Sequence, residues 1–168
     1  MATVAVIMDD WFEDVEYTQP AAAFEKAGHE LVIIGLEKGK VVTGKRQKVQ
    51  ATIQRSLGDV SVDEFDALLI PGGYSPDRLR AHEMAVQFVK DFTKSGKPVF
   101  SICHAPQILI TADVLKNRRI TGYKSIIQDI KNAGAEFIDK EVVVDGNLVS
   151  SRDPGDIPAF IRESLQKL

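Results

Sequence analysis

The chain contains a single cysteine, Cys103, placed where a buried strand is expected to turn directly into a helix. The apolar run Pro98–Ile102 precedes it, and Pro106 suits the first turn of a helix. A turn of this kind presents its apex side chain above the sheet and aims a helix N-terminus at it, which favours a thiolate. The pattern predicts a reactive thiol that titrates below the value of about 8.5 for a free cysteine. The alternative is a small buried side chain without chemistry.

Two neighbouring features could serve this thiol. His104 follows it directly and could act as its base or ion-pair partner, although adjacent side chains meet only where the backbone is irregular. Gly72 and Gly73 follow the apolar run Ala67–Ile70, and their backbone N–H groups could approach a developing oxyanion. A tight turn without a ligand would explain the same two glycines.

Three carboxylates, Glu13, Asp14 and Glu16, follow the apolar run Val4–Met8. A carboxylate at such a place is usually solvated. If one of them is buried beside Cys103, it should keep its proton at neutral pH and donate a hydrogen bond, because two negative charges are costly in one dry pocket.

Strands and helices must alternate along the chain to bring these residues together. The expected strands are Val4–Met8, Leu31–Ile34, Ala67–Ile70, Pro98–Ile102, Phe137–Ile138, Val142–Val144 and Leu148–Val149, with a small hairpin within Gly39–Ile53. The expected helices are Tyr17–Ala27, one from Cys103 to near Ala112, Met84–Phe92, Ser125–Ala133 and Pro158–Leu168. This order predicts one α/β domain over residues 1–168, with a doubly wound, mostly parallel sheet and helices on both faces. Ligands of such sheets bind at the carboxyl ends of the strands, where the candidate residues lie.

Composition excludes several classes of function. A net charge of −3 argues against a nucleic-acid-binding protein. The basic residues between Lys38 and Lys48 are expected to form a solvated hairpin face, or else an anion or partner site. No apolar run is long enough to span a membrane and the start of the chain lacks signal-peptide features, so we expect a cytoplasmic protein.

No cofactor or metal is expected. One cysteine cannot form a zinc cluster, and the three histidines His29, His82 and His104 show no metal-ligand spacing. Arg152 is expected to form a structural ion pair.

Four segments together resemble the ThiJ/PfpI superfamily: Met8–Pro20, Asp66–Gly73, Pro98–Ile110 and Val142–Asp153. The chain is most similar to the branch of PfpI-like intracellular proteases and bacterial general stress proteins, and the superfamily includes the Parkinsonism-associated deglycase. The resemblance covers essentially the whole chain. It implies a flavodoxin-like core related to class I glutamine amidotransferases.

The resemblance also implies roles for individual residues. Cys103 matches the elbow cysteine, Glu16 the carboxyl group that hydrogen-bonds it, and His104 the histidine of a protease-type dyad. Gly73 matches the oxyanion-hole backbone, with the amides of Cys103 and His104 nearby. The remaining expected site residues are Gly72, Glu13, Tyr123 near the pocket, and Asp77, which would reach the dyad of a neighbouring subunit.

Two departures from the family pattern are present. Ala105 stands where the family often has glycine, and Asp77 stands where archaeal proteases of this branch have glutamate. The shorter aspartate weakens the protease interpretation and favours the stress-protein relatives. No His-x-Glu follows His104, which disfavours amidotransferase chemistry.

Three functions therefore remain open. The first is a glyoxalase- or deglycase-type enzyme that acts on reactive dicarbonyls or their adducts. The second is a cysteine peptidase, and the third is a non-enzymatic redox sensor or chaperone that works through oxidation of Cys103. The substrate would be a small carbonyl compound or a peptide or protein. A homo-oligomer, a dimer or larger, is expected, with Asp77 near the contact.

Overall fold

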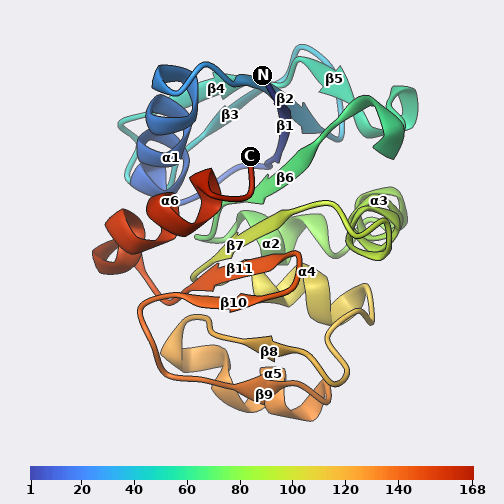
Figure 1. The fold of residues 1–168 in the computed structure, drawn as a ribbon. Coiled ribbons are helices and arrows are strands. Elements are labelled where there is room, and N and C mark those ends of the chain that lie inside the picture. Colours follow the sequence, from blue (N-terminus) through green and yellow to red (C-terminus); the bar gives the residue numbers. More distant parts are fainter.

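A seven-stranded sheet forms the centre of the computed structural model, which describes residues 1–168 (Figure 1). The strand order is β10-β11-β7-β6-β1-β2-β5. All neighbours are parallel except the β10–β11 pair, which confirms the predicted sheet type. The bounds are β1 Thr3–Ile7, β2 Glu30–Gly35, β5 Arg55–Ser56, β6 Ala67–Ile70, β7 Val99–Ile102, β10 Val143–Asp145 and β11 Leu148–Ser151.

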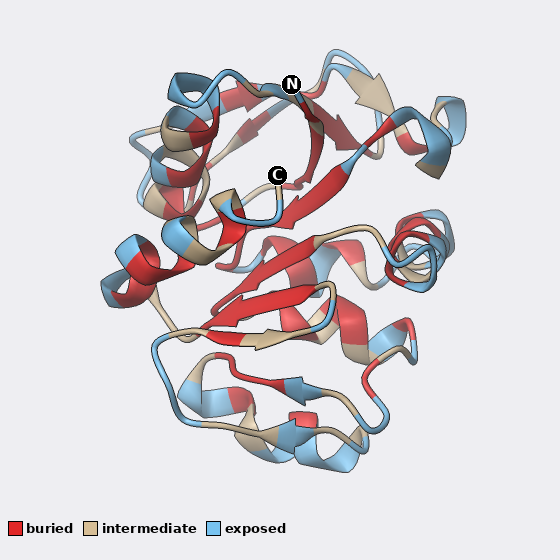
Figure 2. Ribbon diagram, in the orientation of Figure 1, coloured by how far each residue is buried: buried red, intermediate tan, exposed pale blue.

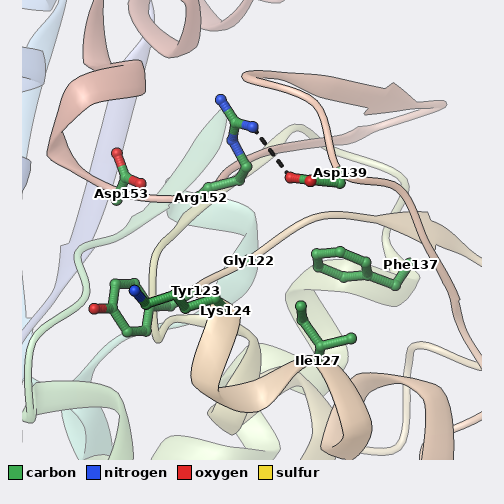
Figure 3. A pocket seen from close by; sticks show the side chains of 8 residues that line it. All are labelled: Gly122, Tyr123, Lys124, Ile127, Phe137, Asp139, Arg152 and Asp153. Carbon is green, nitrogen blue, oxygen red and sulfur yellow. Dashed lines mark hydrogen bonds and ion pairs between the residues drawn. The ribbon is translucent and has the colours of Figure 1, made fainter.

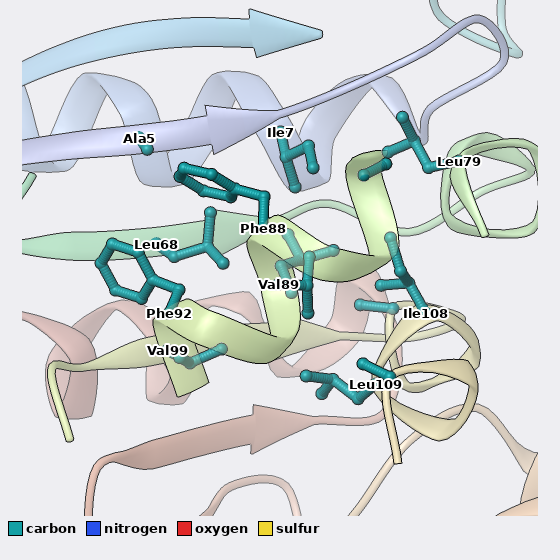
Figure 4. Close-up of a cluster of buried hydrophobic side chains, with 14 of the residues drawn as sticks. Ala5, Ile7, Leu68, Leu79, Phe88, Val89, Phe92, Val99, Ile108 and Leu109 are labelled. Carbon is teal, nitrogen blue, oxygen red and sulfur yellow. The ribbon is translucent and has the colours of Figure 1, made fainter. Parts of the chain in front are cut away.

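Helices cover both faces of this sheet, as predicted. Helices α1 (Asp14–Lys26) and α6 (Ile157–Leu165) pack on one face, against side chains such as Val6 and Leu69. Four further helices share the core of the other face: α2 Ser75–Leu79, α3 Glu83–Lys94, α4 Pro106–Thr111 and α5 Ile127–Asn132. Figure 4 shows this second core, with Ile7 and Leu68 of the sheet beside Phe88 and Phe92 of α3.

The central strands are buried from both sides, because successive side chains of a strand point to opposite faces. All four residues of β6 and of β7 are buried, and Figure 2 shows burial along the sheet with exposure on the outer sides of the helices. Continuous apolar runs therefore predicted the central strands correctly. Because β1, β6 and β7 are parallel neighbours, their carboxyl ends lie at the same edge of the sheet.

The hairpin predicted within Gly39–Ile53 is present, as an antiparallel pair of β3 (Val41–Thr43) and β4 (Gln50–Thr52). Its tip is fastened to the start of α1 by the buried carboxylate of Asp14. That carboxylate accepts the backbone N–H groups of Arg46 (2.9 Å), Lys48 (3.2 Å) and Val49 (3.0 Å). Gly44 leaves room for this contact, since a Cβ there would overlap the Asp14 carboxylate.

The prediction of a solvated hairpin face holds for Lys38 and Lys48, which are exposed, but not for Lys40 and Lys45, which are half-buried in ion pairs. Lys40 Nζ pairs with Asp9 (3.2 Å) and Asp10 (3.4 Å), and Lys45 Nζ pairs with Glu13 (2.8 Å). The carboxylates that follow β1 therefore neutralise the hairpin cations, a contact between segments about thirty residues apart that local sequence patterns do not contain.

Several elements differ from the sequence-based expectation: α2, β5 and β8 (Arg119–Ile120) were not predicted, and the bounds of some predicted helices are shifted. Helix α1 begins at Asp14 rather than Tyr17, so Glu16 lies in its first turn. The region after α4 forms a separate two-stranded parallel sheet of β8 and β9 (Glu136–Phe137), and α5 begins only after a 3₁₀ turn at Lys124–Ile126. The remaining 3₁₀ turns are Leu57–Asp59, Val62–Glu64 and Pro154–Asp156.

We predict that Asp14→Ala lowers the free energy of unfolding by about 2–4 kcal/mol, since three backbone donors lose a charged acceptor. Hydrogen exchange should rise selectively at the amides of residues 46, 48 and 49. The control is Asp63→Ala, because the exposed Asp63 carboxylate accepts no hydrogen bond. Unchanged exchange at the hairpin tip would contradict this account.

Candidate active site

Cys103 stands at the apex of the predicted elbow, immediately after β7. Its backbone has φ = +62°, a left-handed conformation that is uncommon for a residue with a side chain. Both of its peptide groups are fixed: its N–H donates to the Ser151 carbonyl (3.0 Å) and its carbonyl accepts from the Tyr123 N–H (2.8 Å). The residue is 6% exposed, so the thiol lies in a nearly dry pocket.

Glu16 projects from α1 into the same pocket and is fully buried. Its Oε1 accepts the Gly72 N–H (2.8 Å), whereas Oε2 has no hydrogen-bond partner of ordinary geometry. Burial is the main cause that raises the pKa of Glu16 to about 8, so its carboxyl is protonated at neutral pH. This confirms the expectation that a carboxyl beside the thiol keeps its proton.

Gly72 is the point of closest approach in this pocket. A Cβ there would lie 2.5 Å from Glu16 Oε1 and 2.8 Å from Cys103 Cβ. Only glycine therefore lets the thiol and the carboxyl share the pocket. Its N–H is engaged by Glu16, which makes Gly72 a support for the carboxyl rather than the oxyanion donor we had expected.

The prediction of a lowered pKa for Cys103 is contradicted. Burial raises the pKa of the thiol above its ordinary value, and the negative charge of ionised Glu16 raises it further. The backbone N–H groups of His104 and Gly73 act in the opposite direction, as does the charge of Lys45. Desolvation dominates because the following helix, α4, is only six residues long and the pocket excludes water.

His104 lies against the thiol, with its Nδ1 3.4 Å from Cys103 Sγ. Its Nε2 lies 3.2 Å from Ser125 Oγ, and its ring stacks on Tyr123 with the centroids 4.8 Å apart. Burial lowers the pKa of His104, so the ring is neutral at neutral pH. In the tautomer that donates from Nε2 to Ser125, Nδ1 is free to accept the thiol proton.

Backbone donors for a developing oxyanion are fewer than the sequence suggested. The Cys103 N–H is engaged by Ser151, and only the N–H groups of Gly73 and His104 point at the sulfur. Gly73 has φ = +76°, and a Cβ there would lie 2.5 Å from the Glu13 nitrogen. Glycine is thus required at Gly73 by both conformation and space.

Sequence reasoning missed the role of the hairpin at this site. Glu13, expected among the substrate-binding residues, is buried and bound by Lys45 Nζ (2.8 Å) and Arg46 Nε (3.2 Å). Lys45 also lies over the Tyr74 ring, 5.9 Å from its centroid. A cation next to Glu13 could have been suspected from the basic run, but nothing local in the sequence joins the two.

Asp77 is placed differently from the expectation. It is exposed and its Oδ1 is held by Arg80 Nη2 (2.8 Å) of the same chain. It makes no hydrogen bond with His104, although its charge acts to raise the pKa of that histidine. It does not cap α2 either, because Tyr74 occupies the N-cap position of that helix.

Residues 2–167 match the DJ-1/PfpI family. The chain belongs to this family. Protein/nucleic acid deglycase 2 of Escherichia coli is 55% identical over 166 residues, which cover 98% of this chain and 96% of that protein. General stress protein 18 of Bacillus subtilis is 57% identical over 166 residues, with the same coverage of 98% and 96%. These matches confirm the resemblance drawn from the four sequence segments.

The fold is also that of solved members of the DJ-1/PfpI family. A two-domain protein of Anabaena variabilis, which contains DJ-1/ThiJ/PfpI-like and ferritin-like domains, superimposes with a TM-score of 0.97 at 37% identity. The match covers 99% of this chain and 48% of that longer one. The flavodoxin-like architecture implied by the resemblance is therefore confirmed.

Around this family site, Arg152 forms the predicted ion pairs, with Asp156 (2.8 Å) and Asp139 (3.1 Å). No group of three or more His, Cys, Asp or Glu side chains is arranged to hold a metal ion. None of the helices combines the length and the apolar character needed to cross a bilayer.

We predict that the stability of the protein falls as the pH rises between about 5 and 8. In that range the carboxyl of Glu16 is ionised in the unfolded chain but protonated in the folded one, so the unfolded state binds fewer protons. Its contribution to the free energy of unfolding decreases by about 1.4 kcal/mol per pH unit. Denaturant titrations of the wild type and of Glu16→Gln should show this slope only in the wild type; parallel slopes would argue against a protonated Glu16.

A second prediction concerns Lys45, whose positive charge favours the thiolate of Cys103. Lys45→Met should raise the pH at which iodoacetamide alkylates Cys103. Lys48→Met is the matched control, because that side chain is exposed on the same hairpin. Equal midpoints for the wild type and Lys45→Met would rule out an electrostatic role for Lys45.

Proposed function

We propose that the chain is a deglycase-type enzyme of stress protection, which removes dicarbonyl-derived adducts from amines or thiols through Cys103. The observation that carries this proposal is the composition of the pocket: a thiol between a protonated carboxyl, Glu16, and a neutral imidazole, His104. The deglycase name of the relative at 55% identity supports this chemistry, and the name of the general stress protein at 57% identity supports a role in stress protection.

The first step joins the substrate to sulfur. The substrate is an adduct in which one carbon carries both a hydroxyl group and the amine or thiol of the carrier. The bond between this carbon and the carrier breaks, the hydroxyl proton goes to the carrier, and an aldehyde is formed. Cys103 Sγ adds to that aldehyde, while its proton passes through His104 Nδ1 to the oxygen. The N–H groups of Gly73 and His104 stabilise the developing oxyanion.

The second step is an internal redox exchange within the bound substrate. A proton moves from the hemithioacetal carbon to the neighbouring carbonyl carbon, and the hydroxyl proton of the hemithioacetal moves to the neighbouring carbonyl oxygen. The first carbon is thereby oxidised to a thioester and the second is reduced to an alcohol. The Glu16 carboxyl and His104 Nδ1 both contact Cys103 and are the groups available to move these protons. Water then hydrolyses the thioester, which releases a 2-hydroxy acid and restores the thiol.

The raised pKa of the thiol fits this order of events. A preformed thiolate is disfavoured in the dry pocket, so the proton must leave as the C–S bond forms. A neutral His104 at 3.4 Å can accept it, which an imidazolium could not. The pocket therefore favours a general-base mechanism over attack by a free thiolate.

A cysteine peptidase is the second candidate, because the same Sγ–Nδ1 contact would also serve acyl transfer and the charge of Asp77 acts on His104. Use of Cys103 as a redox sensor stays a prediction, in which the protonated Glu16 would hold a sulfinate. Mass spectrometry after peroxide treatment separates that role from catalysis.

We predict that Cys103→Ser loses activity by roughly a thousandfold or more on whichever substrate the wild type turns over, since no second cysteine can replace it. The panel consists of methylglyoxal, methylglyoxal adducts of amines and thiols, and fluorogenic peptides. Glu16→Gln should retain more activity than Glu16→Leu, because the amide still donates a hydrogen bond. An equal loss of activity in the two Glu16 variants would show that Glu16 does not act as a hydrogen-bond donor.

A homo-oligomer that buries the edge of this site is part of the proposal. Tyr74 is 64% exposed and Trp11 is 39% exposed, and both lie beside Gly73 at the carboxyl ends of the strands. Exposed aromatic side chains of this kind are enriched at interfaces. In such an assembly the Asp77 carboxylate would release Arg80 of its own chain and bind the histidine of the partner's dyad.

Sedimentation at micromolar concentration should therefore show a dimer or a larger assembly. Asp77→Ala should reduce activity without dissociating the assembly. A monomer with full activity would end this part of the proposal, whereas an assembly indifferent to Asp77→Ala would remove only the shared site.

A further inference from the structure

A cleft of about 400 Å³ is drawn in Figure 3, and Cys103 is not among the residues that line it. Its walls are formed by the segment Gly122–Lys124, by Phe137 and by Arg152–Asp153. Two of these segments hold the backbone of the cysteine itself: Tyr123 donates to the Cys103 carbonyl, and Ser151, next to Arg152, accepts the Cys103 N–H. The cleft therefore keeps a fixed position relative to the sulfur.

Tyr123 separates the cleft from the dyad. Its ring stacks on His104 and also lines the cleft, so it is shared by the two spaces. A small dicarbonyl needs only the pocket around the sulfur. A cleft of this volume next to it is large enough for a further part of a larger substrate, namely the residue that adjoins the modified side chain.

The lining has the composition of a site for an organic cation. Tyr123 and Phe137 offer aromatic surfaces, and Ile127 offers an apolar one. In Figure 3, Asp153 lies above Tyr123 on one side, and Asp139 lies above Phe137 on the other. Both carboxylates keep unused acceptor positions, because Asp153 uses Oδ1 for the Gly155 N–H and Asp139 uses Oδ1 for Arg152.

The cationic side chains of the lining do not outweigh these carboxylates. Arg152 is already bound by two carboxylates, Asp139 of the lining and Asp156, which does not line the cleft. Lys124 is exposed and is the one remaining cation. Counting Asp139, Asp153 and Asp156 against Arg152 and Lys124 leaves one negative charge in excess.

We propose that this cleft binds a basic side chain, arginine or lysine, of the peptide that carries the dicarbonyl adduct next to it. The stem of the side chain packs between Tyr123 and Phe137, and its cationic end pairs with the free carboxylate oxygens of Asp153 and Asp139. This proposal rests on the proposed deglycase function for its biological meaning, but the binding itself does not depend on turnover. It makes the enzyme selective for adducts in basic polypeptide segments.

The test uses two acetylated dipeptide amides, cysteinyl-arginine and cysteinyl-glutamate, each converted to its methylglyoxal hemithioacetal. The wild type should favour the arginine peptide in kcat/KM by about tenfold. In the double variant Asp139→Asn with Asp153→Asn, this ratio should fall to about twofold or less, because two ion pairs are lost while the asparagine oxygen can still cap Gly155. The ratio is measured within one protein preparation, so it is insensitive to the active fraction.

A matched control comes from a second cleft of about 400 Å³, lined by Leu57, Asp63 and Asp91 among others and not by any residue bonded to Cys103. The double variant Asp63→Asn with Asp91→Asn should leave the ratio unchanged. Equal use of both peptides by the wild type, or a ratio unaffected by the loss of Asp139 and Asp153, would overturn the proposal.

Binding without catalysis separates this inference from the proposed function. Chemical shifts of the Tyr123 and Phe137 rings in Cys103→Ala should respond to acetyl-alanyl-arginine amide and not to the glutamate analogue. If the peptide binds there but no adduct is turned over, the deglycase function fails and the cleft remains. If neither peptide perturbs these rings, the cleft proposal fails whatever the enzyme does.

Discussion

The conformation of Cys103 is the constraint on which the rest of the site depends. A side chain at φ = +62° costs of order 1–2 kcal/mol relative to ordinary backbone, and such a conformation persists only where neighbours hold it. Here β11 accepts the N–H of the residue and Tyr123 donates to its carbonyl. The same two bonds turn the sulfur toward Glu16 and His104 and place the walls of the adjacent cleft.

Burial decides the protonation states at this elbow. The helix end and the backbone N–H groups of Gly73 and His104 favour a thiolate, but they act on a group that is almost out of contact with water. Two acids, Glu16 and Cys103, compete in that volume, and the desolvation cost keeps both protonated at neutral pH. The site is therefore poised for transfer of protons between neutral partners, with His104 as the acceptor.

The sheet and the elbow could be predicted from the sequence because their signals are local. Largely apolar runs mark β1, β6 and β7, and Pro106 marks the start of α4 three residues after the cysteine. The protonated state of Glu16 was also predictable once burial was assumed. The pKa of Cys103 was not, because the extent of burial is decided by Gly72 and the packing of α1, which no local pattern contains.

The hairpin shows why the remaining part of the site escaped sequence reasoning. Asp14 fastens the hairpin tip, and this carries Lys45 to Glu13 across a separation of 32 residues. Asp14 lies two residues before Glu16 on the first turn of α1, so one helix terminus places both the buried acid of the pocket and the cation at its edge. Because α1 starts at Asp14 rather than Tyr17, the same helix terminus holds the hairpin and positions the Glu16 carboxyl in the pocket. A helix that began three residues later would leave Glu16 in a loop and the hairpin without its acceptor.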